Sequence, residues 1–92
     1  MSIQWLFGVI EDRKKHPNEK SYTASLFKEG LPKIAQKVGE EGTEVVVAAL
    51  AQDDQRLIEE VADLTYHTLV LLSARGLTPA QVIAELEKRH RK

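Results

Sequence analysis

The sequence predicts an all-α fold, in which an antiparallel helical hairpin is flanked by short helices. Apolar residues recur at the spacing of one helix face through nearly the whole chain, and no segment shows the sustained alternation of a strand. Glycine, proline and short polar clusters interrupt this pattern only briefly, as is typical of connections between helices. We therefore expect residues 1–92 to form a single domain.

The first two predicted helices are short. Residues 3–15 carry apolar side chains at i, i+3, i+4 and i+7, and Pro17 ends this helix. A second helix is expected over about residues 21–29, because Gly30 suits the left-handed position that often follows a helix.

Two long helices follow and form the hairpin. The third runs to about residue 51 with Pro32 in its first turn, and the fourth covers about residues 54–74 with Asp53 or Asp54 as its N-cap. Their connection is short, which favours antiparallel packing of the two helices.

The last helix has the clearest start signal. Thr78 and Gln81 fit a capping box, and Pro79 takes the first helical position. Val82 and Leu86 are expected to form its buried edge.

The composition limits the classes of function. The 13 Lys and Arg residues nearly balance the 14 Asp and Glu residues, which argues against a nucleic-acid binder. No apolar run approaches the roughly 20 residues of a membrane span, and we expect neither a membrane segment nor a secretory signal. The absence of cysteine excludes disulfides, thiolate metal sites and cysteine nucleophiles. We expect a cytoplasmic domain that self-associates, because so small a core often needs an oligomer interface.

Two acidic pairs on the long helices are the strongest functional signal. Glu41 lies in the middle of the apolar sector of its helix, and Glu44 lies just off the edge of that sector. Glu60 and Asp63 repeat the three-residue spacing in a polar ribbon along the other helix. A carboxylate inside an apolar sector is costly unless something compensates its charge.

Antiparallel packing places both pairs at the same height above the turn, because their midpoints lie almost equally far before and after it. Four facing carboxylates form the all-oxygen site that Mg²⁺ or Mn²⁺ prefers, whereas zinc would recruit more nitrogen or sulfur. The alternative is that both pairs are solvated charges on exposed faces. We predict a metal site formed by Glu41, Glu44, Glu60 and Asp63.

These acids and their surroundings resemble a known family. Glu41-x-x-Glu44 followed by Glu60-x-x-Asp63 is similar to the signature of the all-α nucleoside triphosphate pyrophosphohydrolases of the MazG type. Within that superfamily, the sequence resembles the phosphoribosyl-ATP pyrophosphatases over nearly its whole length. The stretches that carry this narrower resemblance are Ser21-Tyr22-Thr23, Gln36-Lys37-Val38-Gly39-Glu40-Glu41, Glu44-Val45-Val46 and Asp63-Leu64-x-Tyr66-His67.

The resemblance implies hydrolysis of 1-(5-phosphoribosyl)-ATP to 1-(5-phosphoribosyl)-AMP and pyrophosphate, the second step of histidine biosynthesis. It also implies that water attacks the α–β phosphoanhydride with the help of the metal, and that facing hairpins of a homodimer form a helical bundle. Two alternatives stay open. A MazG-type enzyme for another nucleoside triphosphate would have the same metal site, and a non-catalytic dimerisation module would carry the acids as solvated charges.

Further residues are candidates for binding the substrate. Lys37 lies one turn before Glu41 and is predicted to contact phosphate in preference to forming an ion pair within its helix. The family resemblance includes an arginine ahead of the Ser-Tyr-Thr motif, which makes Arg13 a candidate. Ser21 and Thr23 are interpreted equally as phosphate donors or as capping residues of the second helix.

Glu40 and His67 each have two interpretations. Glu40 either orients the attacking water or binds a second ion, or it is a surface glutamate. His67 continues the acidic ribbon one turn beyond Asp63, and we interpret it as a hydrogen-bonded packing residue in preference to a ligand or an acid–base group. His16 and His90 are expected to face solvent.

Overall fold

The computed structural model describes residues 1–91, which form five α-helices and no strand. The predicted all-α class is confirmed, and the order and approximate limits of the helices agree with the sequence pattern. The helices are α1 (Ile3–Lys15), α2 (Tyr22–Glu29), α3 (Leu31–Ala51), α4 (Asp54–Ala74) and α5 (Pro79–His90).

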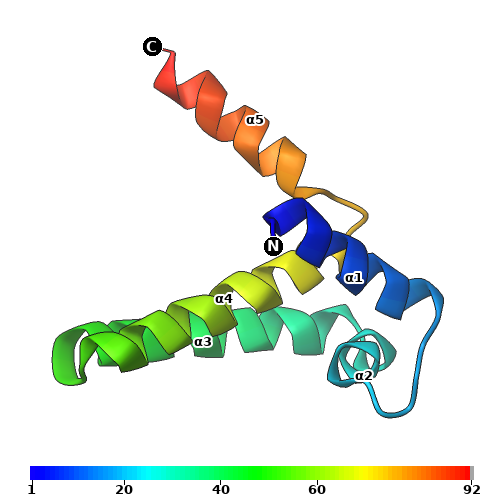
Figure 1. Ribbon diagram of the computed structural model, residues 1–92, viewed down its shortest axis with the longest axis horizontal. Helices are drawn as coiled ribbons and strands as arrows, with labels where there is room; N and C mark the ends of the chain where they lie inside the picture. The colour runs from blue at the N-terminus through cyan, green and yellow to red at the C-terminus, as the bar shows by residue number, and fades with distance from the viewer. Residues whose placement is uncertain (92) are drawn as a thin grey trace.

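Helices α3 and α4 lie side by side and form the predicted antiparallel hairpin (Figure 1). Asp53 is the N-cap of α4, since its side chain accepts a hydrogen bond of 2.9 Å from the backbone N–H of Arg56. Gly30 both ends α2 and precedes α3, with a φ of 97° that glycine adopts at no steric cost. The positive φ of Gly30 therefore lets the chain turn directly from α2 into α3.

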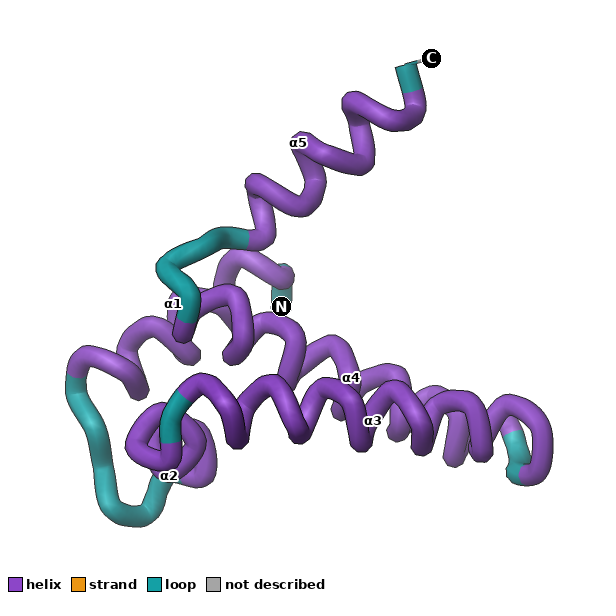
Figure 2. Tube along the Cα trace, turned by 180° about the vertical axis from the view of Figure 1, so that it is seen from behind, coloured by secondary structure: helices purple, strands orange, loops and turns teal. Residues whose placement is uncertain are grey.

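Helices α1 and α2 cover only the end of the hairpin that lies away from the α3–α4 connection (Figure 2). The apolar core forms there, and each of these four helices contributes to it. Its buried members are Phe7, Ile10, Leu26, Ile34, Leu69 and Val70.

A polar contact fastens α1 to the C-terminal end of α4. Lys14 Nζ donates a hydrogen bond of 2.7 Å to the backbone carbonyl of Ser73, whose buried hydroxyl donates to the Glu11 carboxylate. The Ser73 hydrogen bond and the nearby Lys14 charge hold the pKa of Glu11 below its ordinary value. Glu11 therefore stabilises this contact above its unfolded pKa, and that stabilisation is lost as the pH falls through the lower folded value.

Helix α5 begins as predicted but does not pack as predicted. The capping box forms, with the Gln81 side chain accepting a hydrogen bond of 2.8 Å from the Thr78 N–H. The expectation of a buried edge is wrong, because Val82 is 44% exposed and Leu86 is 59% exposed. The connection after Gly76 turns the chain, and α5 projects away from the other helices at 106° to α4 (Figures 1 and 2).

No single helix within residues 1–91 is long and apolar enough to cross a membrane. Helices α4 and α5 meet that condition only when taken together, and they are strongly bent at the break between them.

The half of the hairpin nearest the α3–α4 connection is left uncovered by the other described helices. Apolar side chains from both helices are exposed there, whereas Ile34 of α3 and Leu69 and Val70 of α4 are buried at the opposite end. The exposed residues are Val46, Val47, Leu50, Ile58 and Val61.

Candidate metal centre

Three of the four predicted ligands converge between α3 and α4. Glu41, Glu60 and Asp63 each offer a carboxylate oxygen, and these oxygens all lie within 4.8 Å of one another. Glu41 is 6% exposed and Glu60 is 5% exposed, whereas Asp63 is open to solvent. The structure therefore places these three acids at one level of the hairpin, with two of them buried.

Glu44 lies outside this cluster. It is exposed, in keeping with its expected place at the edge of the apolar sector of α3. Glu44 follows Glu41 by three residues, which is about one turn of the same helix. A ligand role for Glu44 stays a prediction.

Each buried glutamate has one oxygen that lacks a hydrogen-bond partner among residues 1–91. These atoms are Oε2 of Glu41 and Oε2 of Glu60. A buried polar atom without a partner costs about 1–3 kcal/mol, and more when it is charged. Unpaired carboxylate oxygens in a cluster of three acids fit a hard divalent cation, which prefers oxygen ligands.

Lys37 forms the ion pair that we considered as the alternative to a phosphate contact. Its Nζ lies 3.7 Å from the Glu41 carboxylate and 3.9 Å from that of Glu40. Glu40 is exposed and also accepts a hydrogen bond of 3.0 Å from Gln36, so its surroundings are those of a surface glutamate. A phosphate contact of Lys37 and a role of Glu40 at the water both stay predictions.

Arg56 is the corresponding cation on α4, and sequence reasoning missed it. Its guanidinium donates hydrogen bonds to Glu59 and to the buried Glu60. Hydrogen bonds from Gln55 and Arg56 lower the pKa of Glu59. The signal that would have found Arg56 is its position four residues before Glu60, the spacing at which Lys37 precedes the buried acid of α3.

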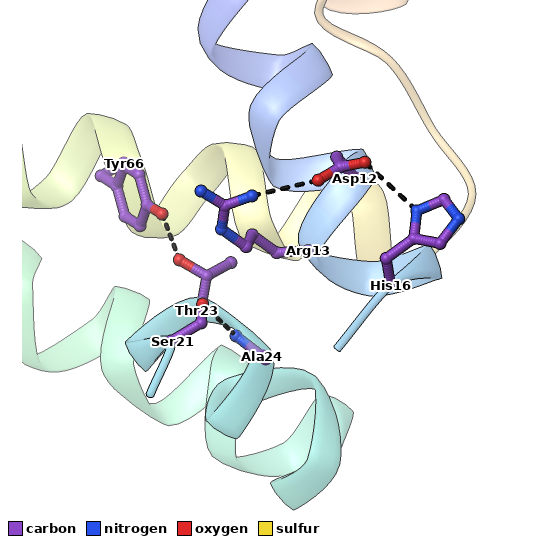
Figure 3. A network of polar contacts seen from close by, with 7 residues as sticks. All are labelled: Asp12, Arg13, His16, Ser21, Thr23, Ala24 and Tyr66. Carbon is purple, nitrogen blue, oxygen red and sulfur yellow. Dashed lines mark hydrogen bonds and ion pairs between the residues drawn. The ribbon is translucent and has the colours of Figure 1, made fainter. Parts of the chain in front are cut away.

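One turn beyond Asp63, two neighbouring residues of α4 are joined to the first turn of α2. The hydroxyls of Tyr66 and Thr23 share a hydrogen bond (Figure 3), and the Tyr22 hydroxyl lies 2.8 Å from Nε2 of His67. His67 Nδ1 lies 2.8 Å from the backbone carbonyl of Asp63. A carbonyl only accepts, so Nδ1 is the donor to Asp63, and this tautomer leaves Nε2 to accept from the Tyr22 hydroxyl. His67 is therefore buried and hydrogen-bonded, as we interpreted it.

The other predicted contacts of the substrate have local partners in the structure. Ser21 caps α2, accepting a hydrogen bond of 3.1 Å from the Ala24 N–H, and Arg13 pairs with Asp12 at 3.0 Å (Figure 3). His16 is exposed, as expected, and also contacts Asp12. For Ser21 this is the capping role considered above, and the phosphate roles of Ser21 and Arg13 stay predictions.

A hollow of about 890 Å³ lies beside the end of α1, the following connection, α2 and the start of α3. The acids of the cluster do not line it. Its walls combine cations with apolar side chains, among them Arg13, Lys14, Lys28, Phe27 and Ile34.

Comparison with known proteins identifies the family. Residues 5–90 match the family model of phosphoribosyl-ATP pyrophosphohydrolase. The chain belongs to this family. The phosphoribosyl-ATP pyrophosphatase of Pyrobaculum neutrophilum is 54% identical over 89 residues, which cover 97% of this chain and 95% of that protein. The resemblance seen in the sequence is confirmed.

Two further members of the phosphoribosyl-ATP pyrophosphohydrolase family differ in length. The phosphoribosyl-ATP pyrophosphatase of Clostridium botulinum is 50% identical over 90 residues, covering 98% of this chain and 82% of the relative. A histidine biosynthesis bifunctional protein HisIE of Xylella fastidiosa is 48% identical over 86 residues, covering 94% of this chain but 42% of that protein. The matched region is therefore part of a longer chain in the bifunctional relative.

Replacing Thr23 by Val tests whether its hydroxyl joins α2 to α4 or binds phosphate. If it joins the helices, the free energy of unfolding should fall by about 1–2 kcal/mol, because the Tyr66 hydroxyl loses its partner. Tyr66→Phe should cost a similar amount, and the double variant should cost little more than either. Urea unfolding measures these values. Unchanged stability together with weaker binding of inorganic pyrophosphate would instead assign Thr23 to phosphate.

Proposed function

We propose that this chain hydrolyses 1-(5-phosphoribosyl)-ATP to 1-(5-phosphoribosyl)-AMP and pyrophosphate, the second step of histidine biosynthesis. The observation that carries this proposal is the match to the phosphoribosyl-ATP pyrophosphohydrolase family over residues 5–90. Relatives of about half identity carry the corresponding name over nearly the whole chain. The cluster of carboxylates supports a hydrolase that works with a divalent cation.

Glu41, Glu60 and Asp63 are the proposed ligands of this cation, Mg²⁺ or Mn²⁺, with Glu44 as the fourth. When bound, the cation would neutralise phosphate charge and lower the pKa of the attacking water. The unpaired Oε2 atoms of Glu41 and Glu60 supply buried ligand atoms for the cation. Asp63 is open to solvent, from which a polyphosphate approaches.

The remaining residues of the proposed site act on the anionic substrate. Lys37 carries its charge beside the cluster and is the proposed contact for phosphate oxygens. The further proposed contacts for phosphate are Arg13 and Ser21. Thr23 joins them if its hydroxyl is released from Tyr66 of α4. Glu40 is the proposed residue for orienting the attacking water or holding a second ion.

Two alternative functions differ in how they fit the cluster. A pyrophosphohydrolase of another nucleoside triphosphate requires the same acids, so only the choice of substrate separates it from the proposal. In a non-catalytic dimerisation module the clustered acids would bind no ligand. The buried, unpaired oxygens of Glu41 and Glu60 argue against it, because their cost needs a compensating ligand.

Release of pyrophosphate from phosphoribosyl-ATP, ATP and dCTP tests the choice of substrate. We expect kcat/KM for phosphoribosyl-ATP to be at least about tenfold higher, because the additional phosphoribosyl group supplies binding energy that the transition state can use. Activity should require Mg²⁺ and disappear in EDTA. Faster hydrolysis of ATP or dCTP would replace the proposed substrate, and no release from any of them would favour the dimerisation module.

Replacing Glu41 by Gln removes one clustered charge and nearly preserves the shape of the side chain. In EDTA the variant should melt at the same temperature as the parent or higher, because fewer like charges are held together. Mg²⁺ should raise the melting temperature of the parent much more than that of the variant, since only the parent retains the full ligand set. Most Mg²⁺-dependent activity should be lost.

The control for this substitution is Glu87→Gln, which changes an exposed glutamate of α5. It should match the parent in both the Mg²⁺-induced shift and the activity. Equal shifts in the parent and in Glu41→Gln, with activity retained, would exclude Glu41 as a ligand.

We also propose a homodimer in which two hairpins face each other. The uncovered half of the hairpin exposes apolar residues of both helices, and Leu50 is the most exposed of them, at 84%. Light scattering at micromolar concentration should give twice the 10.4 kDa mass of the chain. Leu50→Glu should weaken the dimer, because it buries a charge at the interface. A monomeric parent would contradict this assembly.

A further inference from the structure

The two long helices repeat one arrangement of charges around their buried acids. In each helix a cation contacts an exposed glutamate three residues later and a buried glutamate four residues later. A further acid follows the buried one after three residues. The two sets of ion-paired residues are Lys37, Glu40 and Glu41 in α3, and Arg56, Glu59 and Glu60 in α4.

These cations contact only one of the two carboxylate oxygens of each buried glutamate. In both Glu41 and Glu60, Oε1 faces the cation of its own helix, and Oε2 is buried without a hydrogen-bond partner among the described residues. The Lys37 contact, at 3.7 Å, is longer than a hydrogen bond. The cations therefore offset part of the charge at the cluster and leave one buried oxygen of each glutamate available.

We propose that Lys37 and Arg56 are exchangeable counter-ions of this site. They balance the charge of Glu41 and Glu60 when no metal is bound. A divalent cation at the unpaired Oε2 atoms takes over this compensation and weakens the attraction of the carboxylates for Lys37 and Arg56, which then offer their charge to phosphate oxygens. Arg56 thereby becomes a residue that binds the substrate. This inference rests on the proposed function for the identity of the anion.

The contacts of Arg56 show how it can change partners without leaving the site. Nη1 donates to Glu59 and Nη2 donates to Glu60, so the two acids use different nitrogens. Loss of the Glu60 contact frees Nη2 while Glu59 still holds the guanidinium beside the cluster. A freed guanidinium edge suits phosphate, because its planar donors match two phosphate oxygens.

Both cations are accessible from solvent. The Arg56 side chain is 47% exposed and that of Lys37 is 27% exposed, whereas the glutamates with which they pair inside the hairpin are buried. An incoming anion therefore reaches both cations without disturbing the core. An arginine whose only task was to stabilise its helix would show no dependence on metal or anion.

The test is Arg56→Gln, studied by calorimetric titration of the full chain with two probes. Mg²⁺ alone should bind at least about fivefold more tightly, because the ion no longer competes with or is repelled by the guanidinium. Inorganic pyrophosphate at saturating Mg²⁺ should bind at least about fivefold more weakly, because a charge-assisted contact is lost. Arg56→Lys should lie between the parent and Arg56→Gln in both titrations.

The matched control is Arg89→Gln, which breaks an exposed ion pair of 3.0 Å with Glu85, also four residues apart, on α5. It should change neither affinity. If Arg56→Gln binds Mg²⁺ as tightly as the parent or more weakly, Arg56 is not a counter-ion that the metal replaces. If it binds Mg²⁺ more tightly but pyrophosphate equally well, Arg56 does not contact phosphate. Neither titration depends on hydrolysis. If Arg56→Gln binds Mg²⁺ more tightly and pyrophosphate more weakly, but the parent does not hydrolyse phosphoribosyl-ATP, only the proposed substrate is refuted.

Discussion

Burial of two glutamate carboxylates between antiparallel helices is the constraint on which the rest of the structure depends. Removing a charge from water is expensive, and neither Glu41 nor Glu60 is fully paired within the described chain. One oxygen of each faces a cation from its own helix, and the other is buried without a hydrogen-bond partner among the described residues. This buried charge is unfavourable without a metal, and the proposed divalent cation would compensate it.

The other helices divide their tasks along the hairpin. Helices α1 and α2 cover one end, where the apolar core and the contacts of Tyr66 and His67 with α2 fix the position of α4 just beyond Asp63. The opposite end is left uncovered by the described helices, and the proposed dimer would bury it. The acids lie along the middle of both long helices, so their geometry depends on the supported end and is compatible with assembly at the other.

Periodicity and spacing predicted most of the fold and most of the carboxylate cluster. Helix limits and caps depend on neighbouring residues, and the level of Glu41 and Glu60 follows from equal distances along two helices. The direction of α5 does not follow from such signals, because it is set by the short connection after Gly76, and the expected burial of Val82 failed for that reason.

Two polar contacts needed the structure. The spacing of Arg56 and Glu60 permits an ion pair but does not show that Glu60 is buried, and the hydrogen bond between Thr23 and Tyr66 joins helices far apart in the chain. Patterns within one helix indicate which face is buried, but they do not indicate which polar groups meet across helices.

The central claim is that the cluster between α3 and α4 holds a divalent cation. Crystals grown with MnCl₂ and measured at the manganese absorption edge would locate the ion directly by anomalous scattering. We expect a peak bounded by Oε2 of Glu41, Oε2 of Glu60 and the Asp63 carboxylate. Its position would also decide whether Glu44 completes the ligand set. An empty cluster at saturating Mn²⁺, or a peak only elsewhere on the protein, would contradict the account.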